Sequence, residues 1–340
     1  MKWIAKKIFD GGGDKYLKKH AKSSGYLHNI LKFIQKCGNK LFKFDTILSV
    51  AVICVVSFAI TKDVYLSKFA RVCIEKVSFE LNGFLYQNTF DKIAARLVVY
   101  DAKMNNIPLE FIRLGRNNDG GYVVPIAALE SADALMGYGI ADDISFERDF
   151  SQRFDKLSFG FDCGVQNIKT DDSRCHFCSE CIGTSKYLYK DQTSSGHISS
   201  FSEQLQRLKL TNKKVFIKMD IEGAEFDVMD DILKHMGNVT GMVLEIHIPH
   251  GNPEKVLKTL SALNRHLVLV HLHGNNYSDS YFDTKYSSEP IPKVLELTYI
   301  NKNLLSFYEI SKNQKHPKPI DQPSCPTLPE CEFEIIPGLS

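Results

Sequence analysis

The chain has 340 residues, enough for one large domain or two small ones, and its 44% hydrophobic residues are ordinary for a globular protein with a buried core. The formal net charge of +2 is too small to indicate nucleic acid as a partner. The charge is unevenly spread, because residues 1–45 hold eleven lysines against three aspartates and the rest of the chain is net acidic.

An uncharged apolar segment, residues 46–61, follows the basic arm of residues 1–45. A lysine-rich arm before an apolar segment is the layout of a single-pass anchor, and it would keep the arm cytoplasmic and place the main domain across the membrane. The fifteen residues 46–60 would rise only about 22 Å as a helix, less than the roughly 30 Å hydrocarbon core. A buried helix or strand in a cytoplasmic protein is therefore the alternative, and both interpretations stay open.

The rest of the chain is predicted to contain a helical linker, a main domain and a tail. Residues 62–104 show amphipathic helical spacing, and residues 313–340 are rich in proline and predict an extended surface segment. The main domain, residues 105–312, alternates strand patterns with helical patterns, which predicts an α/β domain with a mainly parallel sheet covered on both faces. The strand patterns cover residues 134–140, 156–162, 215–220, 242–248, 266–274 and 294–300, and the helical patterns cover residues 145–153, 199–208, 224–236 and 253–264.

The motif MGYGIADDISFE ends the first of these strands and begins a helix. Gly137 and Gly139 let the backbone come close to a ligand, and Asp143 is a candidate helix cap. The third glycine of a dinucleotide fingerprint is replaced here by Ala141-Asp142, and two carboxylates would repel a pyrophosphate. The loop therefore favours a cationic or zwitterionic ligand, with a simple strand-to-helix turn as the alternative.

Asp162 ends the next strand, 23 residues after Gly139. An acid at the tip of the second strand, about 20 residues beyond a glycine turn, is the usual partner of a ribose diol. The two features together favour a nucleoside-binding site over two unrelated turns.

The chain resembles the FkbM-type branch of the class I S-adenosylmethionine-dependent methyltransferases, and related methyltransferase-like proteins, in several blocks: FIRLGRNNDGGYVVP, GYGIADDISFE, IKMDIEGAEFDVM, VLEIH, HLHGNNY and LELTYI. The resemblance covers about residues 107 to 310. It implies a Rossmann-like fold with a seven-stranded, mostly parallel sheet and S-adenosylmethionine as cofactor. The GYG turn departs from the GxGxG of better-known members.

Carried over residue by residue, the resemblance implies the cofactor contacts. Gly137, Tyr138, Gly139 and Asp143 would line the methionine side of the cofactor, and Asp162 would hold its ribose. The cofactor is a sulfonium cation without phosphate, so it suits an acidic loop.

The same resemblance places Asp220 and Glu222, in the DIEGAE block, beside the transferred methyl group and its acceptor. A hydroxyl acceptor that loses its proton during attack needs a base within hydrogen-bond reach. Helix capping by Asp220 is the alternative, although it would not require both acids.

Two further strand tips carry Glu245 with His247, and His271 with His273 and Asn275. Because alternate residues of a strand share a face, each pair points the same way. Such a carboxylate and imidazole cluster is typical of a divalent metal site or of an acid–base pair.

Cysteines in the block CHFCSEC form a separate signal. Cys175, Cys178 and Cys181 could bind a structural zinc ion, with Cys163 or His176 as a fourth ligand. In an oxidising compartment, disulfides among these cysteines, and between Cys325 and Cys331, are the alternative.

The sequence thus predicts an S-adenosylmethionine-dependent methyltransferase that acts on a hydroxyl of a sugar, glycolipid or small metabolite. The expected partner is a small-molecule or glycan acceptor, with membrane association through the N-terminal segment. A catalytically silent, membrane-tethered module that binds S-adenosylmethionine or serves as a scaffold is the alternative, and a nicotinamide enzyme is disfavoured by the acidic loop.

Overall fold

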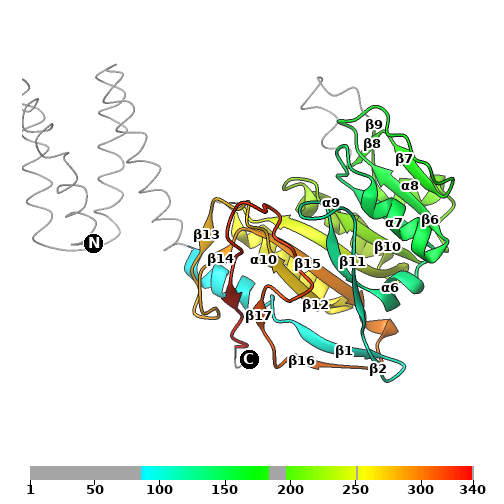
Figure 1. Ribbon diagram of the computed structural model, residues 1–340. Coiled ribbons are helices and arrows are strands. Elements are labelled where there is room, and N and C mark those ends of the chain that lie inside the picture. Colours follow the sequence, from blue (N-terminus) through cyan, green and yellow to red (C-terminus); the bar gives the residue numbers. More distant parts are fainter. Residues whose placement is uncertain (1–85, 184–196, 250–251, 339–340) are drawn as a thin grey trace, which may run out of the picture. The chain divides into compact units, whose positions relative to one another are not determined.

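A computed structural model describes residues 86–183, 197–249 and 252–338 (Figure 1). These residues belong to one compact unit that runs from Asn82 to Ser340. The basic arm, the apolar segment 46–61 and most of the predicted linker lie outside them. Among the described helices, none is long and apolar enough to cross a membrane.

Seven strands of the described residues form the main sheet, in the order β12-β15-β11-β10-β5-β6-β7. Neighbouring strands from β7 to β11 are parallel, and β15 is antiparallel to both β11 and β12. This sheet confirms the predicted α/β, Rossmann-like architecture with a seven-stranded, mostly parallel sheet. The strands are β5 (Ala134–Tyr138), β6 (Leu157–Phe161), β7 (Cys175–Cys178), β10 (Val215–Met219), β11 (Val239–His247), β12 (Leu267–Gly274) and β15 (Val294–Asn301).

The central strands are mostly apolar, as expected where both faces of a sheet are buried, although Lys218 of β10 and Glu245 of β11 are buried as well. Successive side chains point to opposite faces, so Leu135 and Phe216 join one hydrophobic cluster, whereas Met136 and Ile217 join the other. The sheet therefore separates two cores.

Helices cover both faces of the sheet, as predicted. The cluster that contains Leu135 includes residues of α6 (Ile126–Glu130) and α7 (Ser145–Phe154). The opposite cluster includes residues of three helices besides the short helix at residues 86–94. These are α8 (Phe201–Arg207), α9 (Glu225–Ile232), which continues into the 3-10 helix η2 (Leu233–His235), and α10 (Pro253–His266).

The chain order creates a switch point at the middle of the sheet. From β5 the chain adds β6 and β7 on one side, then returns to β10 and β11 on the other side of β5. At such a point the loops at the carboxyl ends of the two central strands lead away in opposite directions and leave a crevice for a ligand.

The residues just before the main domain belong to its core and do not form a separate linker. Residues 86–94 are helical, and Ile93 and Leu97 are fully buried in the cluster that contains Met136. Arg96 donates a hydrogen bond to Ser261 of α10. Next in the chain, β1 (Tyr100–Met104) forms a small sheet with β2 (Ile107–Pro108) and β16 (Phe307–Ile310).

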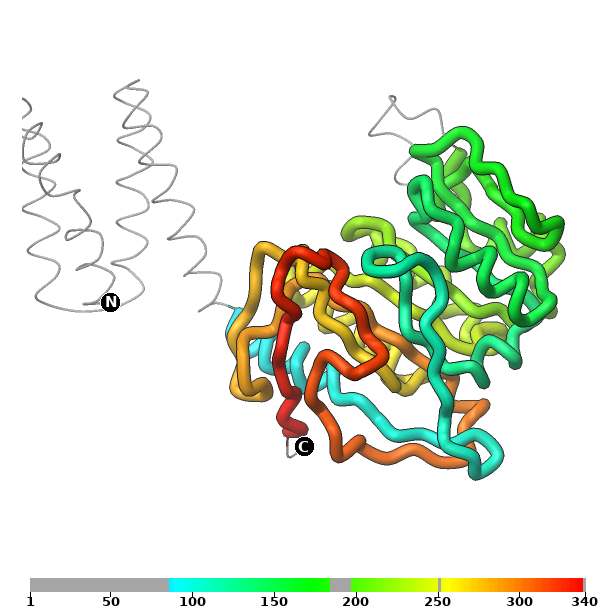
Figure 2. The backbone as a smooth tube through the Cα atoms, viewed as in Figure 1, coloured from blue at the N-terminus to red at the C-terminus, as the bar shows by residue number. Residues whose placement is uncertain are grey.

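The proline-rich tail is packed against the domain, whereas the sequence predicted an extended surface segment. Figure 2 shows the tail running beside the segment that follows β12. Phe333 and Ile335 are 3% and 1% exposed, and the Cys325 amide donates to the Asn276 side chain. Apolar residues between the prolines explain this packing.

The remaining pairs of short strands are β3 (Phe111–Leu114) with β4 (Tyr122–Pro125), β8 (Glu180–Ile182) with β9 (His197–Ser199), β13 (Tyr281–Phe282) with β14 (Ile291–Pro292), and β17 (Lys315–His316) with β18 (Phe333–Glu334); η3 (Lys302–Leu304) is a 3-10 turn.

Candidate functional site

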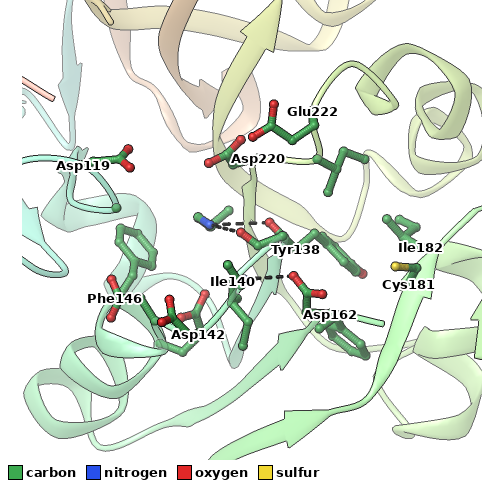
Figure 3. A pocket seen from close by; sticks show the side chains of 18 of the residues that line it. Asp119, Tyr138, Ile140, Asp142, Phe146, Asp162, Cys181, Ile182, Asp220 and Glu222 are labelled. Atoms are coloured by element: carbon green, nitrogen blue, oxygen red, sulfur yellow. Dashed lines mark hydrogen bonds between the residues drawn. The ribbon is translucent and has the colours of Figure 1, made fainter. Parts of the chain in front are cut away.

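A cavity of about 370 Å³ opens at the carboxyl ends of β5, β6 and β10, at the switch point of the sheet (Figure 3). Six of the predicted cofactor-binding and catalytic residues line it: Tyr138, Gly139, Asp143, Asp162, Asp220 and Glu222. The other lining residues that matter below are Asp119, Asp142, Glu147, Arg116 and Lys218. The cavity thus joins the two predicted sets, the cofactor contacts and the catalytic acids.

The two loops that form the cavity touch through Gly139. This residue has a φ of +70°, and a Cβ atom there would lie 1.5 Å from the carbonyl oxygen of Asp220. The Asp220 amide donates to the Tyr138 carbonyl at 3.0 Å. The glycine is therefore needed for contact between the loops, whereas the sequence predicted close approach to a ligand.

Gly137 does not line the cavity, because its role is to make room for Glu147. A Cβ atom at Gly137 would lie 1.8 Å from Glu147 Oε1. Glu147 is fully buried, and neither of its carboxylate oxygens has a hydrogen-bond partner among the described residues. Burial raises the pKa of Glu147 to about 7, although the nearby Lys218 ammonium lowers it. Glu147 was not predicted as a site residue, because in the sequence it is an ordinary acid in the first turn of a helix.

Asp162 fastens the end of β6 to the loop after β5. Its Oδ2 accepts a hydrogen bond from the Ala141 amide at 2.9 Å, and its Oδ1 accepts one from the Gly164 amide at 2.7 Å. Each carboxylate oxygen has a second lone pair, so Asp162 can still accept hydrogen bonds from a ligand.

Tyr138, the last residue of β5, forms part of the cavity wall. Its ring stacks on Phe161, with ring centres 5.0 Å apart, and its hydroxyl donates to Gln204 Oε1 at 2.8 Å. Burial raises the pKa of Tyr138 well above its usual value, so the phenol stays neutral. The side chain of Tyr138 is therefore held in place by Phe161 and Gln204.

Acids dominate the cavity wall. Seven carboxylates line it against two cationic side chains, Arg116 and Lys218. Arg116 Nε lies 3.3 Å from Asp143 Oδ2, and Lys218 Nζ donates to the Gly139 carbonyl at 2.9 Å. With both cations bound to protein groups, the electrostatic field of the cavity favours a positively charged ligand.

The four predicted catalytic residues come together beside this cavity. His247 Nε2 lies 3.4 Å from Glu222 Oε2 and 3.5 Å from Glu245 Oε1. Ligand atoms of Asp220, Glu222 and His247 all lie within 4.8 Å of one another. Figure 3 shows Asp220 and Glu222 together at one end of the cavity. Asp220 also accepts a hydrogen bond from the Tyr122 hydroxyl at 3.1 Å.

Burial and charge shift the pKa values of Asp220, Glu245 and His247. Burial raises the pKa of Asp220, although Lys218 and His247 lower it. Burial also raises the pKa of Glu245 well above its usual value, and the Asp220 carboxylate raises it further. For His247, burial lowers the pKa, but the neighbouring acids outweigh burial and leave the pKa raised. Perturbed groups of this kind are typical of functional sites.

Glu225 shapes the loop between β10 and α9. It is fully buried, and its Oε1 accepts hydrogen bonds from the amides of Ile221 at 3.3 Å and Gly223 at 3.1 Å. These bonds support a turn in which Glu222 and Gly223 have φ angles of +55° and +95°. A left-handed conformation is uncommon for a glutamate, and such strain is frequent at functional sites.

His271 and His273 do not join this cluster. His271 Nε2 pairs with Asp321 of the tail at 3.0 Å, and His273 Nδ1 pairs with Glu296 at 3.2 Å. Strand β15 lies between β11 and β12, so it separates these histidines from His247. Asn275 does reach the cluster, because its amide donates to Glu245 Oε1 at 3.2 Å.

The predicted zinc site at Cys175, Cys178 and Cys181 does not form. Cys181 is bonded to Cys163 in a disulfide, the alternative that the sequence left open. Cys175 and Cys178 belong to β7, and residues three apart on a strand point to opposite faces. Cys175 accordingly packs with Ile140, whereas Cys178 packs against the opposite cluster. Cys325 and Cys331, the other possible disulfide, are free thiols.

Comparisons with known proteins give no family assignment. No protein-family model matches the chain, and no curated protein matches it. One solved structure, a protein from Shewanella sp. PV-4 named for riboflavin biosynthesis, aligns with 13% identity and a TM-score of 0.21 over 52% of this chain and 78% of that one. A likeness this weak carries no argument about function.

Proposed function

We propose that this protein is an S-adenosylmethionine-dependent methyltransferase that methylates a hydroxyl oxygen of a sugar, a glycolipid or a small metabolite. The observation that carries the proposal is the cavity at the switch point of the sheet, in which seven carboxylates face two cations that are already bound to protein groups. The likeness of the GYGIADDISFE and DIEGAE blocks to the FkbM-type methyltransferases supports the same conclusion.

The lining of the cavity fits this cofactor better than it fits a dinucleotide. A sulfonium and an ammonium group would be attracted by the carboxylates of Glu147 and Asp220, which hold buried oxygens without partners among the described residues. The open lone pairs of Asp162 suit the two hydroxyls of a ribose. A pyrophosphate would meet repulsion from Asp142 and Asp143 instead.

When bound, S-adenosylmethionine supplies an electrophilic methyl group. The chain's own task is to hold the acceptor hydroxyl in line with that group, to exclude water and to remove the hydroxyl proton. We assign the removal of the proton to the cluster of Asp220, Glu222, Glu245 and His247, because it lies beside the cavity and because the pKa values of Asp220, Glu245 and His247 are raised.

The test follows label from methyl-labelled S-adenosylmethionine into a mixture of glycolipids and small hydroxylated metabolites, with the full chain as enzyme. Asp220→Asn should reduce the transfer by about 10²- to 10⁴-fold, the range for loss of an acid–base group. Asp230→Asn changes an exposed acid of α9 that pairs with Lys258, and it should leave the transfer unchanged.

The silent-module alternative predicts a different pattern. There, the wild-type chain and both variants would bind S-adenosylmethionine equally and transfer no label to any acceptor. Binding is therefore measured on the same three proteins.

A further inference from the structure

We propose that Asp220, Glu222 and His247 hold a divalent metal ion at the mouth of the cavity. Each residue offers one ligand atom, and these three atoms lie within 4.8 Å of one another. Two carboxylates and one imidazole form a mixed oxygen and nitrogen ligand set. Such a set suits Mn²⁺ or Fe²⁺, whereas Ca²⁺ typically binds in sites made of oxygen ligands alone.

The orientation of His247 supports this site. Its Nδ1 lies 3.3 Å from Oε1 of Glu225, a fully buried carboxylate, so Nδ1–H can donate to Glu225 and leave Nε2, which lies on the side of Glu222 and Glu245, to bind an ion. A histidine that binds a metal through one ring nitrogen usually donates the other N–H to a carboxylate in this way. Glu225 also shapes the loop that carries Glu222, so one buried side chain positions two of the proposed ligands.

Buried oxygens without partners are an independent sign of a cation site. Glu245 is 5% exposed, and its Oε1 lies 3.5 Å from His247 Nε2. Three carboxylate oxygens of the cluster have no hydrogen-bond partner among the described residues: Oε2 of Glu245, Oε2 of Glu225 and Oδ1 of Asp220. Because a buried carboxylate without a partner is costly, such a group of oxygens points to an ion or to ordered water.

The charges of the cluster favour an ion over water. Four carboxylates, from Asp220, Glu222, Glu225 and Glu245, surround His247, which carries at most one positive charge. Lys218, whose charge lowers the pKa of Asp220, donates to the Gly139 carbonyl. A dication would balance two of these negative charges at once, whereas water would balance none.

The role of the ion rests on the proposed function, although the ion site itself does not. An ion held by Asp220 and Glu222 borders the cavity, because both residues line it. There it would bind the acceptor oxygen and lower the pKa of its hydroxyl, and the proton would pass to Glu245, a carboxylate of the cluster that is not a proposed ligand.

The test is a titration of the full chain with Mn²⁺ in the absence of S-adenosylmethionine. The electron paramagnetic resonance signal of free Mn²⁺ measures how much of the ion is bound. The wild-type chain should bind one equivalent, and His247→Gln should weaken that binding at least tenfold. Glu222→Gln should do the same. The Glu222 side chain is 85% exposed, so a loss of Mn²⁺ binding in this variant would not be caused by misfolding. Asp230→Asn is the matched control and should bind like the wild-type chain.

Absence of Mn²⁺ binding to the wild-type chain, or binding that both ligand variants retain in full, would overturn the ion site. A separate titration with S-adenosylmethionine keeps the two proposals distinct. Cofactor binding without Mn²⁺ binding leaves the methyltransferase proposal standing, and Mn²⁺ binding without cofactor binding leaves the ion site standing.

Discussion

Substitution of Gly139 by alanine tests whether the two loops of the cavity depend on one another. The new Cβ atom would lie 1.5 Å from the Asp220 carbonyl oxygen, and it would sit on a residue with a φ of +70°. The left-handed conformation costs about 1–2 kcal/mol for a non-glycine residue, and overpacking against a backbone atom costs about 1–3 kcal/mol more. We expect Gly139→Ala to lower the free energy of unfolding by about 2–5 kcal/mol.

Two other glycines separate these contributions. Gly223 has a φ of +95°, and no atom lies within 4 Å of the place that a Cβ atom would take, so Gly223→Ala should cost only the conformational part, about 1–2 kcal/mol. Gly237 has open space and no left-handed φ, so Gly237→Ala should change stability by less than about 0.5 kcal/mol. Urea unfolding of the three variants gives each difference from the shift of the midpoint. A loss for Gly139→Ala no larger than that for Gly223→Ala would refute the contact between the loops.

Three further predictions concern the core, the pH dependence and the disulfide. Leu97→Ala should lower the free energy of unfolding by about 2–5 kcal/mol in the same urea assay, because Leu97 is fully buried; a change below about 1 kcal/mol would contradict its place in the core. The pKa of Glu147 is raised from 4.5 to about 7 in the folded state, so the free energy of unfolding should fall by about 3 kcal/mol as the pH rises from 4.5 through 7. Glu147→Gln should abolish that fall, and a variant with the same pH profile as the wild-type chain would contradict the raised pKa of Glu147. Replacing Cys163 and Cys181 together by alanine should lower stability by about 3 kcal/mol, as expected for a bridge across 18 residues, and mass spectrometry should find these two cysteines joined in the wild-type chain.

The strands and helices of the main domain could be predicted because their signals are local. Apolar runs such as those of β5 and β10 and the helical spacing of α9 and α10 depend only on neighbouring residues. The sequence placed Asp220 and His247 at two strand tips but did not show that they meet; they do so because β10 and β11 are parallel neighbours, whose carboxyl ends share one edge of the sheet.

Features that depend on distant residues could not be predicted. The burial of Glu147 depends on the missing side chain of Gly137 on a neighbouring strand. The pairing of His271 with Asp321 depends on where the tail packs, 50 residues later in the chain. The spacing of the cysteines in CHFCSEC likewise fits both a metal site and a strand with a disulfide, and only the strand pairing of β7 decides between them.

The central claim is that the acidic cavity binds S-adenosylmethionine with Asp162 on its ribose, and calorimetric titration of the full chain with this cofactor tests it most directly. We predict micromolar binding that Asp162→Ala weakens at least tenfold and that Asp171→Ala, which changes an exposed acid of the loop after β6, leaves unchanged. Folding of both variants is checked by circular dichroism. Absence of binding to the wild-type chain, or equal binding to the folded Asp162→Ala variant, would contradict the account.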